Sequence, residues 1–182
     1  MSSLPDVAVL ASGRQKATGE GDWISSQLLT TTVDAVKADP DRFLVECFGP
    51  TSVVVDYRDI SEVLELLPLL PGHLTATVHT EEDDPHAPTL LRALRDTAGR
   101  LLWNGWPNGV AVSPAQHHGG PYPATSNAAY TSVGLQALRR FQRPVAYQNL
   151  PDGLLPTALR DRNTLGLVRL LDGELTRADV VR

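Results

Sequence analysis

The only cysteine of the chain, Cys47, stands between an acidic and an aromatic residue in the stretch Val-Glu-Cys-Phe-Gly-Pro. A catalytic thiol reacts as its thiolate, which a nearby cation or a helix N-terminus stabilises. The neighbour here is Glu46, whose negative charge disfavours ionisation of the thiol. The residue types therefore favour a buried, unreactive cysteine before a strand over a nucleophile.

Two adjacent histidines, His117 and His118, are the next candidates for chemistry. Adjacent residues of an extended chain point in different directions, and no further His, Asp or Glu recurs at a ligand spacing, so the pattern disfavours a metal site. Gly119 and Gly120 follow, but the chain has neither phosphate-binding glycine pattern. It also lacks the G-x-S-x-G turn of serine hydrolases. These residues alone identify no catalytic group and no metal ligand.

The totals limit the classes of partner. The chain has 182 residues, enough for one domain with a real core. Its formal net charge of −5, with no large cluster of Lys and Arg, argues against a nucleic-acid partner. No apolar run approaches the roughly 18 residues that span a bilayer, and the N-terminus does not resemble a signal peptide. We expect a cytoplasmic protein with no membrane partner.

Hydrophobic periodicity predicts alternating strands and helices. In the helix that begins after Asp59, this residue and Glu62 should form a capping box, and Pro68 should shorten the last turn. A second helix, carrying Leu90 and Leu94, should end at Gly99. Glycine and proline, 14 of each, concentrate in a structured loop at 104–126. The other predicted elements are an extended segment at 23–33, strands at 51–57, 74–79 and 100–103, a helix over 131–142, a strand at 144–148, and a hairpin about Asp172-Gly173.

This alternation predicts an α/β fold. We divide the chain into an N-terminal loop segment over 1–24, a main body over 25–143 and a tail over 144–182. The tail contains the last predicted strand and the terminal hairpin.

Five stretches resemble, in order and in spacing, motifs of the NAD(P)-dependent aldehyde dehydrogenase family. The first, around Cys47, is similar to the family's E-x-F-G-P motif. The last two are most similar to the branch that acts on ketoglutaric semialdehyde and fatty aldehydes. The resemblance covers about residues 25–175 and implies part of a catalytic domain, an open sheet flanked by helices. The other stretches are GHLTATVH, AGRLLWNGWPNGVAV, HHGGPYPATSN and TSVGLQALRRFQRPVAYQNLP.

The resemblance implies roles for two neighbours of the cysteine. Glu46 matches the glutamate that accepts hydrogen bonds from the nicotinamide ribose hydroxyls, and Phe48 matches the phenylalanine beside the nicotinamide ring. A carboxylate is a good acceptor for a diol, and an aromatic ring supports a flat ring. Cys47 falls on the variable position of the motif. The implied cofactor is NAD or NADP.

Other positions of the resemblance concern the substrate and partners. The segment 104–121 matches the wall of the aldehyde tunnel, which places Val110, His117 and His118 there. Residues 144–148 match a tail strand that extends the sheet of a partner subunit. We therefore expect the chain to associate with itself or with an aldehyde dehydrogenase chain.

The resemblance is incomplete. The family's nucleophilic cysteine, general-base glutamate, oxyanion asparagine and nucleotide-binding domain match nothing in the chain. We therefore expect a C-terminal fragment of an aldehyde dehydrogenase, with ketoglutaric semialdehyde as a candidate substrate, that is inactive alone and exposes apolar surface. Three alternatives remain: half of a split enzyme, a non-enzymatic partner of a full-length relative, and a small separate enzyme that uses Cys47.

Overall fold

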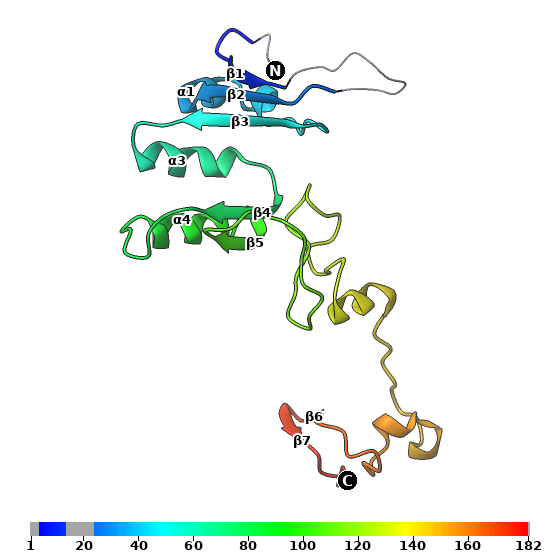
Figure 1. Cartoon of the computed structure of the whole chain (residues 1–182). Helices are drawn as coiled ribbons and strands as arrows, with labels where there is room; N and C mark the ends of the chain where they lie inside the picture. Colours follow the sequence, from blue (N-terminus) through cyan, green and yellow to red (C-terminus); the bar gives the residue numbers. More distant parts are fainter. Residues whose placement is uncertain (1–3, 14–23, 182) are drawn as a thin grey trace. The chain divides into compact units, whose positions relative to one another are not determined.

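The computed structural model describes residues 4–13 and 24–181, and the chain divides into two compact units, 1–140 and 141–182 (Figure 1). The first unit mixes strands with short helices in two open sheets, which confirms the predicted α/β class. One sheet has three strands in the order β1-β2-β3, and the other pairs β4 with β5. Their bounds are β1 Ala8–Ser12, β2 Gln27–Thr32, β3 Thr51–Asp56, β4 His73–Val78 and β5 Ala98–Trp103.

The three-stranded sheet is built from residues that favour extended structure. β3 has the sequence TSVVVD and pairs in parallel with β2, while β1 pairs with β2 antiparallel. The side chain of Thr32 then caps helix α1 (Val33–Ala38) by accepting a hydrogen bond from the Ala35 amide. The side chains of Leu29 in β2 and Val36 in α1 are both almost completely buried. Helix α2 (Pro40–Phe43) leads back toward β3.

Helix α3 (Ile60–Leu66) connects β3 to β4. The Asp59 carboxylate accepts a hydrogen bond from the Ser61 amide, and this bond holds the pKa of Asp59 below its usual value. Glu62 differs from the predicted capping box: its carboxylate accepts from the amide and side chain of Arg58, one residue before the cap, which lowers the pKa of Glu62. As predicted, Pro68 ends the α-helix, which continues as one 3-10 turn, η1 (Leu67–Leu69).

The second sheet carries the main apolar cluster of the first unit. Leu67, Val78 and Leu94 are buried together between η1, β4 and helix α4 (Ala87–Leu94). At the far end of the sheet, the Asn104 side chain exchanges hydrogen bonds with the backbone of Thr80. These two hydrogen bonds join the residues that follow β4 to those that follow β5.

Several sequence-based boundaries differ from the structure. β1 lies within 1–24, where we expected only a loop, and α1 follows β2 without a break. Gly99 lies inside β5, because α4 ends at Leu94. The helix expected over 131–142 is the 3-10 helix η2 (Leu135–Phe141), and its apolar residues Leu138 and Phe141 are largely exposed.

The second unit has little regular structure. Residues 144–148, expected as a strand, form none, because a strand needs a partner and the described part of this unit offers none to them. The terminal hairpin is confirmed: Asp172 and Gly173 both have positive φ, as a tight two-residue turn requires. The Arg169 guanidinium donates hydrogen bonds to three carbonyl oxygens that surround the hairpin. The elements of this unit are η3 Asp152–Leu154, η4 Thr157–Leu159, β6 Arg169–Leu171 and β7 Glu174–Thr176.

The chain exposes more surface than its mass requires. Its accessible area is 13607 Å², whereas a compact monomer of 19.7 kDa exposes about 8,600 Å². Two separate globules of the sizes of the two units would expose about 10,000 Å². Only nine apolar residues of the described part are buried, while large side chains such as Phe48, Trp106 and Val112 are at least 78% exposed. The expected exposure of apolar surface is thus confirmed.

Candidate functional site

The segment 44–50 carries the candidate cofactor residues and joins α2 to β3. Its end is fixed, because the Pro50 carbonyl accepts a hydrogen bond of 2.9 Å from the Gln27 amide of β2. The residues before it project from the sheet, and Phe48 is 90% exposed. Cys47 is also exposed, which corrects the expectation of a buried thiol: the segment lies outside the sheet that would have covered it.

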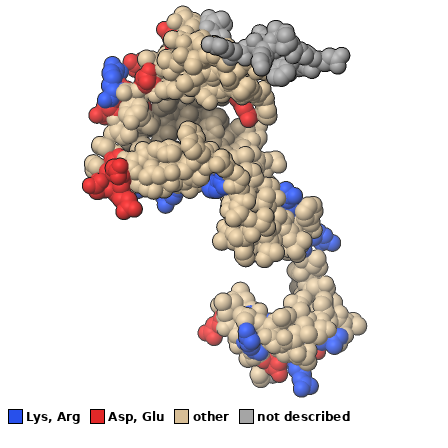
Figure 2. All heavy atoms as spheres, in the orientation of Figure 1, with Lys and Arg blue, Asp and Glu red and all other residues tan. Residues whose placement is uncertain are grey.

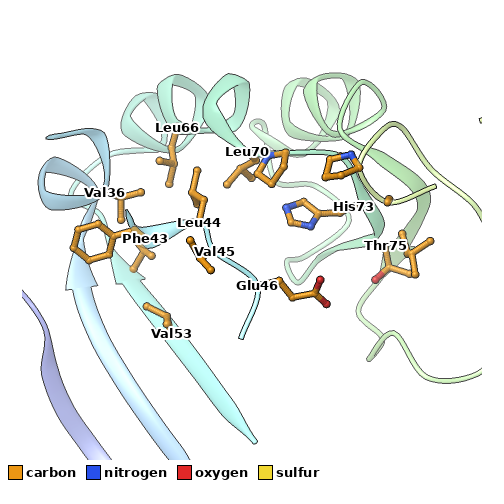
Figure 3. A pocket seen from close by; sticks show the side chains of 16 residues that line it. Val36, Phe43, Leu44, Val45, Glu46, Val53, Leu66, Leu70, His73 and Thr75 are labelled. Carbon is orange, nitrogen blue, oxygen red and sulfur yellow. The ribbon is translucent and has the colours of Figure 1, made fainter. Parts of the chain in front are cut away.

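A cavity of about 790 Å³ opens beside this segment in the first unit. Figure 2 shows the hollow, with walls drawn mostly in the colour of uncharged residues. Figure 3 shows the lining side chains, which come from both sheets and from the helices between them. The lining is Val36, Phe43, Leu44, Val45, Glu46, Val53, Val55, Leu66, Leu70, Pro71, Gly72, His73, Leu74, Thr75, Pro123 and Ala124.

Among the described residues that line this cavity, Glu46 is the only acidic one. In Figure 3 it lies at the side of the cavity where His73 and Thr75 begin β4, away from the apolar side chains of Val36 and Phe43. Glu46 is exposed, and none of the ion pairs among the described residues includes its carboxylate. An accessible carboxylate at the edge of an apolar cavity can accept hydrogen bonds from the hydroxyls of a ligand.

The candidate tunnel residues lie in the long segment between β5 and η2. The Arg100 guanidinium of β5 donates a hydrogen bond to the Asn108 carbonyl, close to Val110 in the chain. The His118 amide donates to the hydroxyl of buried Thr131. Both His117 and His118 are half-buried, and the Nδ1 atom of His118 is buried without a hydrogen-bond partner in the described structure.

Close backbone contacts hold this segment against the start of the second sheet. A Cβ atom on Gly99 would lie 1.8 Å from the carbonyl oxygen of Gly119, and one on Gly120 would lie 2.4 Å from that of His73. Only glycine permits such approaches. The paired glycines, which could have suggested a phosphate site, therefore serve to pack the segment against β4 and β5.

The structure brings together only part of the candidate set. Glu46 lines the cavity, but Phe48, Val110, His117 and His118 do not. Their family-derived roles remain predictions. The cavity adds two polar side chains that sequence reasoning did not single out, His73 and Thr75. Both lie in the stretch GHLTATVH, whose resemblance to the family was the one signal that could have found them.

Two further searches cover the described residues only. No three His, Cys, Asp or Glu side chains among them gather closely enough to hold a metal ion. Within the same part of the chain, no helix is long and apolar enough to cross a bilayer.

No family model matches the chain. Curated relatives do: alpha-ketoglutaric semialdehyde dehydrogenase 2 of Azospirillum brasilense is 46% identical over 175 residues, which cover 96% of this chain and 33% of that protein. Alpha-ketoglutaric semialdehyde dehydrogenase of Acinetobacter baylyi is 50% identical over 133 residues, 72% of this chain and 25% of that protein. The chain thus spans about a third or less of the length of these relatives.

Solved structures show the same fold. Two crystal structures of the Delta-pyrroline-5-carboxylate dehydrogenase from Mycobacterium tuberculosis, one of them bound with NAD, superpose with TM-scores of 0.57 and 0.56. They are 21% and 22% identical in sequence, and the match covers 84% and 85% of this chain but 29% and 28% of theirs. By its curated relatives, and in agreement with this fold, the chain belongs to the aldehyde dehydrogenase family and corresponds to part of the length of its members.

Proposed function

We propose that the chain forms one part of the catalytic domain of an NAD(P)-dependent aldehyde dehydrogenase, with alpha-ketoglutaric semialdehyde as its substrate. In this role it places the Glu46 carboxylate beside the nicotinamide ribose and contributes a wall of the aldehyde tunnel. The observation that carries the proposal is the 46% identity to a semialdehyde dehydrogenase over 96% of the chain. The position of Glu46 at the edge of a cavity supports it.

The residues present fit part of a dinucleotide site. Glu46 offers an accessible acceptor for two ribose hydroxyls, and Phe48 is free to pack against a ring. The chain has no glycine pattern for the pyrophosphate, so the rest of that site has to come from other residues. When bound, NAD(P) supplies the hydride acceptor for aldehyde oxidation.

The chain alone lacks a recognisable nucleophile for this reaction. Its single thiol, Cys47, is exposed and has an acidic neighbour, Glu46, rather than a base or a cation. Covalent aldehyde oxidation needs an activated nucleophile before hydride can leave. We therefore propose that activity requires the remaining part of an aldehyde dehydrogenase.

A chimera tests this function. These 182 residues replace the aligned region of the Azospirillum relative, and NADH and NADPH formation is measured with alpha-ketoglutaric semialdehyde. Loss of charge-assisted hydrogen bonds costs about 1.5–3 kcal/mol, so Glu46→Gln should raise the KM for the preferred cofactor about tenfold to a hundredfold. Glu82→Gln, at an exposed site outside the cavity, serves as the matched control. An active chimera in which both variants have the same KM for the cofactor would refute the role of Glu46.

A second candidate function is that of a non-enzymatic partner of a full-length aldehyde dehydrogenase. The exposed apolar surface favours it, because large apolar patches mark interaction sites. An inactive but folded chimera, together with binding of the isolated chain to the intact relative, would favour this candidate.

A further inference from the structure

Two consecutive strands of the first unit, β3 and β4, do not pair with each other. They are joined by helix α3 and run in the same direction in Figure 1. Such a crossover normally links parallel strands of one sheet. Among residues 4–13 and 24–181, β3 pairs only with β2 and β4 only with β5, so each strand has one free edge there.

The hydrogen-bond register identifies the groups on the free edge of β3. The Gln27 amide donates to the Pro50 carbonyl, and Gln27 is level with Thr51. Because N–H and C=O groups alternate in direction along a strand, the backbone of Val54 faces β2. The backbone groups of Val53 and Val55 therefore face the free edge.

The same reasoning applies to β4. The His73 amide donates to the Thr97 carbonyl, and His73 is level with Ala98 of β5. At the other end of β4 the Val78 carbonyl accepts a hydrogen bond from the Asn104 amide, and the pairing with β5 skips Leu74, so alternation is counted from Val78 and the backbone of Ala76 faces β5. The backbone groups of Thr75 and Thr77 therefore face away from β5, on the free edge.

Both free edges border the same hollow. The side chains of Val53 and Val55 line the cavity from one side, and Leu74 and Thr75 line it from the other. Val53 is 37% exposed and Val54 41%, although parallel strands are normally covered on both faces. A small molecule could fill about 790 Å³, but it would leave two rows of peptide groups unpaired. An extended polypeptide would pair them.

We propose that this slot, the space between the free edges of β3 and β4, receives one or more β-strands from a polypeptide that carries the part of an aldehyde dehydrogenase outside these 182 residues. The inserted strands complete one sheet through both halves of the first unit. The identity of the partner rests on the proposed function; the need for a strand rests on the two edges alone.

The length of the relatives and the exposed area support this occupant. The aligned region is only 33% of the Azospirillum protein, so such enzymes contain ample chain outside it. The accessible area of 13607 Å² exceeds the about 10,000 Å² of two separate globules, so the chain leaves ample surface for a partner polypeptide to cover.

A second copy of the chain does not fit the slot as well. A strand inserted between two free edges needs both of its own edges free. Every strand in the described ranges is already paired on at least one side, and β6 and β7, with three residues each, are shorter than the six-residue edges they would have to cover.

Hydrogen exchange, resolved by residue, tests the slot. The 182-residue chain is produced with and without a separate polypeptide, the Azospirillum relative lacking its aligned region. In the free chain, the amides of Val53 and Val55 should exchange at least tenfold faster than that of Val54, and the amides of Thr75 and Thr77 faster than that of Ala76. In the complex these differences should disappear. A complex in which they persist, or the absence of a complex, would overturn the proposal.

A pair of substitutions provides a second readout. Val53→Lys places a charge in the slot and should weaken the complex at least tenfold, whereas Val9→Lys on β1, at a site 49% exposed and outside the cavity, should not. Because Val53 is itself partly exposed, the variant should fold, and retention of fast exchange at Thr75 relative to Ala76 in the free variant would verify this. Equal affinities of the two variants would contradict the slot. An active chimera without a two-chain complex would refute only the slot, and a complex with protected edges beside an inactive chimera would refute only the enzymatic function.

Discussion

The substitution Gly99→Ala should destabilise the first unit by forcing two backbones apart. An added Cβ would lie 1.8 Å from the Gly119 carbonyl oxygen, 2.6 Å from its carbon and 2.8 Å from the Gly120 Cα. All three contacts are with backbone, so no side chain can turn away to relieve them. The segment at 117–121 would have to move off β5.

The expected magnitude follows from overpacking of well-packed sites, which costs about 1–3 kcal/mol. With a urea dependence of about 2 kcal/mol per molar, the unfolding midpoint should fall by roughly 0.5–1.5 M. The matched control is Gly109→Ala, where an added Cβ meets nothing within 4 Å. The control should leave the free energy of unfolding within about 0.5 kcal/mol of that of the starting chain.

The assay is urea unfolding followed by tryptophan fluorescence, to which Trp103 of β5, the strand that contains Gly99, contributes. Nuclear magnetic resonance of the His118 amide gives a local readout, because the hydrogen bond that this amide donates to the Thr131 hydroxyl should weaken when the segment moves. Equal midpoints for the two variants would show that the segment does not press on β5, and the account of its position would be wrong.

Three other perturbations follow from the structure. Asp59→Ala should lower the thermal midpoint at neutral pH because it removes the cap of α3. The folded pKa of Asp59 is lowered, so its contribution to stability is complete above the unfolded pKa of about 4 and is lost as the pH falls through the folded pKa. The difference in thermal midpoint between variant and parent should therefore shrink toward pH 3. Cys47→Ser should change the turnover of the active chimera by no more than about twofold, since a surface substitution away from the reacting atoms changes little. Complete loss of turnover would instead support the alternative in which Cys47 is the nucleophile. The isolated chain should self-associate with rising concentration in light scattering, because its apolar side chains are exposed; a monodisperse monomer across the range would contradict this.

Local signals in the sequence predicted β3 and both strands of the second sheet well. The runs around β3, β4 and β5 are rich in β-branched and apolar residues, and each strand lies within a residue or two of its expected range. Pro68 and the Asp172-Gly173 turn also act as expected, because their backbone preferences operate without help from distant residues.

Features that depend on distant partners were less predictable. Gly99 read as the end of a helix, but its role is a close approach to Gly119, some twenty residues later in the chain. The strand at 144–148 and the helix over 131–142 carried suitable patterns, but their apolar faces are largely exposed in the described structure. Pattern alone does not provide the partner that such elements need.

The candidate site likewise combines residues that the sequence identified with residues that only the structure brought together. The exposure of Glu46 in a cavity agrees with a binding role, whereas His73 and Thr75 were found only when the structure placed them beside it. Cys47 was expected to be buried and unreactive because its acidic neighbour disfavours a thiolate, yet it is exposed in the segment that leads into β3.

The free edges of β3 and β4 also bear on how much of the chain a cell can keep. Unpaired strand edges template aggregation, and partly open chains are removed by proteases. Copies made in excess of a strand-donating partner would therefore be lost first, and the steady level of the chain would follow the level of that partner. Synthesis of the two in equal amounts, close together in time, is the arrangement that such edges favour.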